Sequence, residues 1–192
     1  MLVLIAGLLL FLGVHSTRVF ADGWRTLQLQ RLGLGRWKLL YTAVSLAGFA
    51  LIVWGFGLAR ADPVVLWSPP RWTHHLAALL VLLAFILVVA AYVPGTRIKS
   101  MVGHPMVLGV KVWAAAHLLA NGTLADVLLF GSFLVWAIVT YAAARRRDRA
   151  AGARYVAAGL GRDALAVAIG VAAFGAFAAF GHRWLIGVDP FA

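Results

Sequence analysis

Cysteine is absent from this 192-residue chain, and its absence removes several kinds of site at once. Without thiols there can be no disulfide, no thiolate-ligated zinc or iron–sulfur cluster, and no covalent C-x-x-C-H attachment of haem. Carboxylates are scarce as well, with only six in the whole chain. A bound metal ion would therefore depend mainly on the six histidines.

Charged residues make up only 12% of the chain, whereas hydrophobic residues make up 64%. Soluble domains average about 45–50% apolar and about 25% charged residues. The composition therefore predicts a single integral membrane domain over residues 1–192. The net charge of +11 would indicate nucleic-acid binding in a soluble chain. Here the basic residues lie between apolar stretches, as in loops that face anionic lipid, so we expect the lipid bilayer and no nucleic acid as a partner.

The apolar stretches predict an all-α fold, namely a polytopic membrane helix bundle with six transmembrane helices. The expected spans are residues 1–20, 38–59, 72–93, 105–121, 124–144 and 164–185. Pro94-Gly95 and Asn121-Gly122 mark the ends of the third and fourth helices. Gly48 and Gly55 give the second span a face for close helix packing. Residues 22–36 alternate arginines with leucines and are too short and too charged to span, so we expect them at the membrane surface.

The basic residues also predict the orientation of the bundle. If the N-terminus lies outside, all of the 17 lysines and arginines except Arg60, Arg71 and Arg183 fall on the inner side. Loops rich in lysine and arginine stay in the cytoplasm. Six spans then place both termini on the outer, periplasmic side of a bacterial inner membrane.

The segment 103–121 is apolar enough to enter a bilayer, yet it contains two histidines, a lysine and an asparagine. An ionisable side chain at membrane depth costs about 2.5–3.5 kcal/mol and usually marks a site or a buried partner. On a helix, Trp113 and Asn121 share a face with His117. A flat apolar wall beside an imidazole suits a porphyrin. The alternative is that His117 is only hydrogen-bonded to a backbone carbonyl of a neighbouring helix.

His15, in the first span, could face the same cofactor as His117, or could instead be a histidine near the lipid headgroups. Arg18, one turn on, could hold a propionate or extend to the membrane surface. At about 1.5 Å per residue, His15 lies about 20 Å from the outer end of its helix, and His117 only about 6 Å from the Asn121 turn. The two depths match if the fourth helix is short or tilted. His75, near the outer end of its own span, is the alternative partner.

The remaining histidines have weaker cases. His104 begins the fourth helix on a different face from His117, and is a further candidate metal ligand. His74 and His75 are about 100° apart on a helix, so one of them is expected to face the lipid headgroups. His182 is expected to anchor its helix at the membrane interface.

Five short motifs, in order along the chain, give it a resemblance to a known family. They are His15-Ser16, then WSPPRWTHH at 67–75, AYVPG at 91–95, GHPM at 103–106 and WAAAHLLANG at 113–122. On these motifs, which cover nearly the whole length, the chain resembles the NnrU family, named for a protein linked to denitrification and nitric oxide metabolism. It also resembles the plant 15-cis-zeta-carotene isomerase, a haem b membrane enzyme with axial histidine ligands.

The resemblance implies a haem b protein with denitrification or respiratory membrane enzymes as partners. By motif, His15 and His117 correspond to the isomerase's axial ligands, and His104 matches another histidine that the two share. One alternative is a haem-dependent cis-trans isomerase of a long, carotenoid-like polyene, although the isomerase has a longer N-terminal region. The other alternative is a membrane assembly factor without a cofactor.

Overall fold

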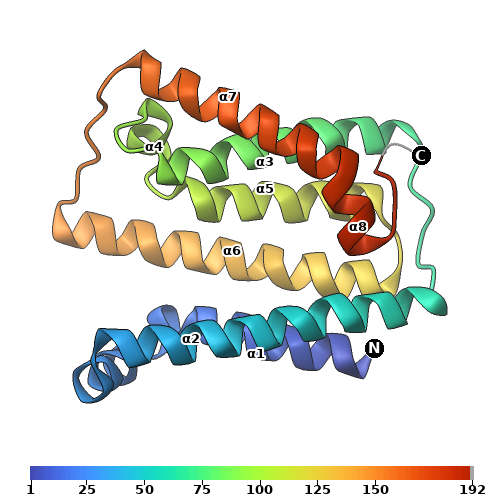
Figure 1. The fold of residues 1–192 in the computed structure, drawn as a ribbon, viewed down its shortest axis with the longest axis horizontal. Helices are drawn as coiled ribbons and strands as arrows, with labels where there is room; N and C mark the ends of the chain where they lie inside the picture. Colours follow the sequence, from blue (N-terminus) through green and yellow to red (C-terminus); the bar gives the residue numbers. More distant parts are fainter. Residues whose placement is uncertain (191–192) are drawn as a thin grey trace.

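The computed structural model describes residues 1–190, which are largely helical (Figure 1). The elements are α1 (Leu2–Phe20), α2 (Asp22–Ala61), α3 (Trp72–Tyr92), α4 (Arg97–Val102), α5 (Pro105–Ala120), α6 (Leu124–Ala151), α7 (Leu160–Ala176), the π-helical turn η1 (Phe177–Gly181) and α8 (His182–Ile186). Within residues 1–190 no strand occurs, and Val65 and Thr123 form an isolated β-bridge. The all-α prediction is confirmed.

Five helices are long and apolar enough to cross a membrane: α1, α2, α3, α6 and the continuous helix Leu160–Ile186. They lie at five of the six predicted spans. The fourth predicted span is α5, which has 16 residues. At about 1.5 Å per residue it is about 24 Å long, short of the hydrocarbon core of about 30 Å. The count of six spans and the outward orientation of both termini stay predictions.

A bend divides α2 at Gly33. Its φ of 73° and ψ of 162° are non-helical, and this is a conformation that glycine adopts far more easily than other residues. The arginine-bearing residues 22–32 therefore form an arm distinct from the long apolar part of α2. The arm lies at the end of the bundle opposite the N-terminus (Figure 1).

Glycines bring α1 and α2 to close backbone distance. A Cβ added at Gly7 would lie 2.6 Å from the backbone nitrogen of Ile52, and one at Gly48 would lie 2.8 Å from that of Phe11. A Cβ at Gly55 would also overlap backbone atoms of α1. The predicted packing face of α2 is confirmed.

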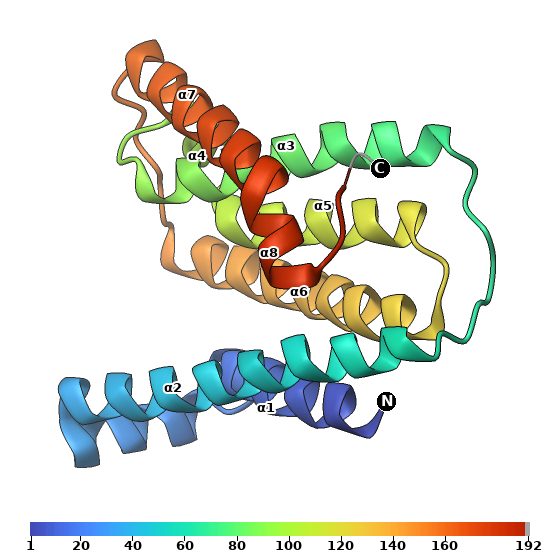
Figure 2. The same ribbon diagram turned by 45° about the vertical axis from the view of Figure 1, so that its right-hand side comes forward.

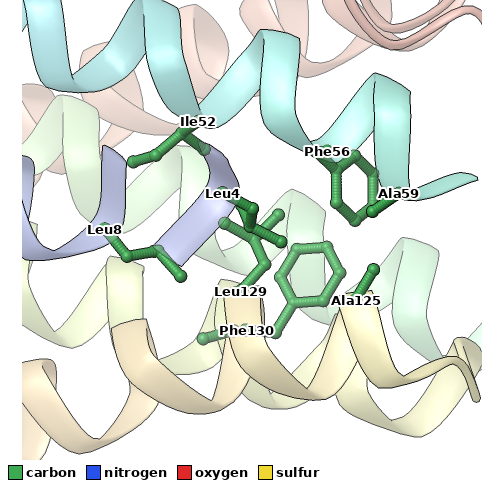
Figure 3. Packing of buried hydrophobic residues seen from close by; sticks show 9 residues of the cluster. Leu4, Leu8, Ile52, Phe56, Ala59, Ala125, Leu129 and Phe130 are labelled. Carbon is green, nitrogen blue, oxygen red and sulfur yellow. The ribbon is translucent and has the colours of Figure 1, made fainter. Parts of the chain in front are cut away.

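An apolar cluster joins α1, α2, α5 and α6 (Figure 3). Its buried members are Leu4, Leu8, Ile52, Phe56, Ala59, Ala114, Ala125, Leu129 and Phe130. On the other side, α3 packs against α5 and α7. The short helix α5 thus lies between α3 and α6, inside the bundle (Figures 1 and 2).

The turn that ends α5 is covered by the loop between α2 and α3. The backbone N–H groups of Leu66 and Trp67 donate to the carbonyl of Gly122, at 2.8 and 3.1 Å. In return, the N–H of Leu124 donates to the carbonyl of Val64 at 2.9 Å. Irregular backbone at membrane depth is tolerated where protein covers it. These bonds give the turn after α5 backbone partners within the protein.

Candidate functional site

A cavity of about 450 Å³ lies between α2, α3, α5, α6 and the segment from α7 to residue 190. Its walls are largely aromatic, from Phe49, Phe56, Phe85, Trp113, Phe130, Phe133, Phe174 and Phe177. The polar side chains that line it are His74, His117, Asn121, His182 and Asp189. Its volume falls within the range of about 300–1,000 Å³ that is typical of sites for small molecules and cofactors.

His117 lines the cavity between two aromatic rings. Its imidazole stacks on Phe130 with ring centroids 4.5 Å apart, and lies 5.1 Å from Trp113. Its Nδ1 lies 2.9 Å from the backbone oxygen of Trp113. A carbonyl oxygen only accepts, so Nδ1 carries the proton and the neutral ring keeps Nε2 unprotonated. This is the tautomer of metal-binding histidines that donate their second nitrogen to a backbone carbonyl.

Trp113 and Asn121 line the same cavity as His117. Trp113 packs edge-on to Phe130 and Phe133, at 5.2 and 5.4 Å between ring centroids. Asn121 donates twice to the carbonyl of His117, from its backbone N–H at 2.9 Å and from Nδ2 at 2.8 Å. The predicted end of the helix at Asn121-Gly122 is confirmed, since α5 stops at Ala120.

His15 lies apart from the cavity, between α1 and α6. Its ring stacks on Phe11 at 4.2 Å, and its Nδ1 donates to the Phe11 carbonyl at 2.7 Å. It meets α6 at Trp136, 6.2 Å away, whereas His117 meets α6 at Phe130. These two positions on α6 are about 9 Å apart along its axis. The two predicted axial ligands therefore pack against different turns of α6.

Arg18, His75 and His104 also lie outside the set of residues that line the cavity. Arg18 is exposed in the last turn of α1, and His75 is exposed in the first turn of α3. His104 is the N-cap residue of α5, at the end of the bundle away from the cavity histidines. The structure brings together His117, Trp113 and Asn121, and separates them from the other predicted site residues.

The family described as NnrU protein matches residues 3–190. The chain belongs to the NnrU family. Comparison with curated proteins and comparison with solved structures each found no match. The resemblance to the NnrU family is thus confirmed, and the matched range of this NnrU chain includes every residue that lines the cavity.

Two further histidines of this NnrU chain line the cavity, although the sequence did not single them out as cofactor ligands. His74 donates from Nε2 to the carbonyl of Ala120 at 3.0 Å. His182 donates from Nδ1 to the carbonyl of Val188 at 2.7 Å. Neither contact follows from helix spacing, because one joins α3 to α5 and the other depends on how the chain turns after α8. The feature of the sequence that marks His74 and His182 is chemical, because each is a histidine within an apolar helix that has few other polar groups.

His104 takes part in a polar cluster with residues of α6 and the loop after it. The carboxylate of Asp148 lies 2.9 Å from His104 Nε2 and 3.7 Å from a guanidinium nitrogen of Arg145. The Tyr155 hydroxyl donates to both Asp148 oxygens at 3.2 Å. Burial raises the pKa of Tyr155, and the hydrogen bond to Asp148 raises that pKa further. The cluster fastens the loop 152–159 to α6.

Proposed function

We propose that this NnrU-family protein binds haem b in the bacterial inner membrane, in support of denitrification or nitric oxide metabolism. One observation supports haem as the cofactor. His117, held by the Trp113 carbonyl in its metal-binding tautomer, lines an apolar cavity of about 450 Å³ within the helix bundle. The link to denitrification, with membrane enzymes of that process as partners, is what the resemblance to the NnrU family implies, and the chain belongs to that family. The five apolar helices support the location in a membrane.

The donor set fits haem better than a bare metal ion. Within residues 1–190, no group of three or more His, Cys, Asp or Glu side chains is placed to hold a metal ion. A porphyrin supplies the equatorial nitrogens itself, so the protein has to provide an axial ligand and an apolar enclosure. His117 supplies the ligand, and the aromatic walls supply the enclosure.

His117 would hold the iron through Nε2, and Trp113 and Phe130 lie beside its imidazole ring. A cation for the propionates is available at Arg60, whose guanidinium lies 5.9 Å from the ring centroid of Phe56, a cavity residue. Arg60 also donates to the carbonyl of Ile186 at 2.9 Å, which keeps it at the cavity's edge. Bound haem would supply redox or gas-binding chemistry.

An optical spectrum of the purified protein, oxidised and reduced, tests the proposal. Protein from haem-replete cells is expected to show a Soret band that is lost with His117→Ala. His75→Ala is the matched control, because His75 is exposed and does not line the cavity. A colourless wild-type preparation would overturn the proposal and leave the cofactor-free assembly factor.

A further inference from the structure

A second histidine lines the cavity with the same tautomer as His117, and we infer that His182 Nε2 is the second axial ligand of the iron. The inference rests on the proposed haem function and goes beyond it. It assigns a ligand to the C-terminal segment, where the family resemblance indicated His15. Four features of the structure support it.

The first is the hydrogen bonding of the ring. His182 and His117 both line the cavity. His182 Nδ1 lies 2.7 Å from the carbonyl oxygen of Val188, so Nδ1 carries the proton and Nε2 is unprotonated in the neutral ring. His117 has the same arrangement with the Trp113 carbonyl. Each imidazole is thus held by a backbone acceptor in the form that binds a metal.

The second feature is the turn that orients the side chain of His182. His182 directly follows η1, the π-helical turn Phe177–Gly181. Such turns are rare and occur frequently at functional sites, because the extra residue changes the direction of the side chains after it. The ring of Phe177, another cavity residue, lies edge-on to His182 with centroids 6.0 Å apart.

The third is the turn after α8. Gly187 ends the helix with φ of 77°, in the left-handed region that glycine adopts without strain. The chain then turns back, which brings the carbonyl of Val188 to His182 Nδ1. A residue with a side chain would be strained at Gly187. The end of α8 at Gly187 therefore positions the carbonyl that accepts the hydrogen bond from His182 Nδ1.

The fourth is the attachment of α8 near His117. Ile186, one turn after His182, packs against the apolar cluster that contains Phe130. His117 stacks on that same ring. The Arg60 hydrogen bond to the Ile186 carbonyl joins α8 to α2 as well. Both imidazoles are consequently carried by elements that pack against this one apolar cluster.

The other histidines fit the second position less well. His15 does not line the cavity, and it packs against Trp136, about 9 Å along the α6 axis from Phe130, against which His117 packs. His74 lines the cavity, but its Nε2 donates to the carbonyl of Ala120. The unprotonated nitrogen of His74 is then Nδ1, next to its own Cβ, where the backbone hinders access to a porphyrin iron.

The spin state of the ferric protein tests the inference, measured by electron paramagnetic resonance together with the optical spectrum on the full-length, haem-loaded protein. The wild type is expected to be low-spin, with two imidazole ligands. His182→Ala is expected to become high-spin, and added imidazole should restore the low-spin signal. His15→Ala is the matched control, expected to stay low-spin.

His182→Met keeps the test decisive if His182→Ala loads haem poorly. A methionine in place of an axial histidine raises the reduction potential, so the midpoint potential of this variant should lie above that of the wild type. A low-spin His182→Ala protein, an unchanged potential in His182→Met, or a high-spin His15→Ala protein would overturn the inference while haem binding stood. A wild type without haem would overturn the proposed function itself.

Discussion

Replacing Asp148 with alanine removes the acceptor that holds the loop 152–159 against α6. The Asp148 side chain is 15% exposed and accepts hydrogen bonds from both His104 and Tyr155. Hydrogen bonds to a charged group contribute about 1.5–3 kcal/mol each. Only the Tyr155 bond joins the loop to α6, because His104 lies before α5, so we count one bond at the low end of that range. The free energy of opening the loop should fall by about 1.5 kcal/mol.

Trypsin cleavage after Arg154 measures that opening, since Arg154 precedes the residue that binds Asp148. When a loop closes faster than it is cut, the cleavage rate follows the open population. A loss of about 1.5 kcal/mol corresponds to cleavage about 10 times faster. The measurement is the initial rate on detergent-solubilised protein, with the cut identified by mass spectrometry.

Asp22→Ala is the matched control for Asp148→Ala. Asp22 pairs only loosely with Arg25, at 3.6 Å, and its side chain is 55% exposed. Its removal should leave the cleavage rate after Arg154 unchanged, because exposed ion pairs contribute little. If trypsin cleaves Asp148→Ala and Asp22→Ala at the same rate as the wild type, the polar cluster does not hold the loop and the reasoning fails.

Two further predictions concern protonation and packing. Because the pKa of Tyr155 is raised, its bond to Asp148 should be intact below the ordinary tyrosine pKa of about 10 and be lost as pH rises through the higher value. The phenolate absorbance of wild type minus Tyr155→Phe should show a midpoint above about 10, and one below it would contradict the assignment. Gly55→Ala should lower thermal stability by about 1–3 kcal/mol, since its Cβ would overlap the backbone of α1. Gly57→Ala on the same helix, which meets open space, should raise stability by about 0.5–1 kcal/mol; equal shifts in the two melting curves would contradict the packing argument.

Helix ends were predictable because their signals are local. Pro94-Gly95 ends the third helix for steric reasons, and α3 stops at Tyr92. Proline suits the first turn of a helix, and α5 begins at Pro105. The shared face of His117 and Trp113 also follows from helix spacing alone. These features depend on residues within one or two turns of each other.

Features that join distant parts of the chain were not predictable in this way. His104 and Asp148 meet across 44 positions of sequence, and no periodicity relates them. The direction of His182 depends on the π-helical turn before it, which carries no distinctive sequence signal. The relative depth of His15 and His117 depends on how α1 and α5 slide along α6. Tertiary packing sets that register, and composition does not.

The short helix α5 has a consequence for how the protein is made. A helix of 16 residues is too short to rest stably in a bilayer alone, and its last turn needs partners for its backbone groups. Those partners come from both directions along the chain: Leu66 and Trp67 precede α5, and α6 follows it. Synthesis must therefore reach α6 before α5 can be enclosed. The helix that bears His117 can therefore be enclosed only once α6 has been made, and the cavity is complete only when the segment up to residue 190 joins it.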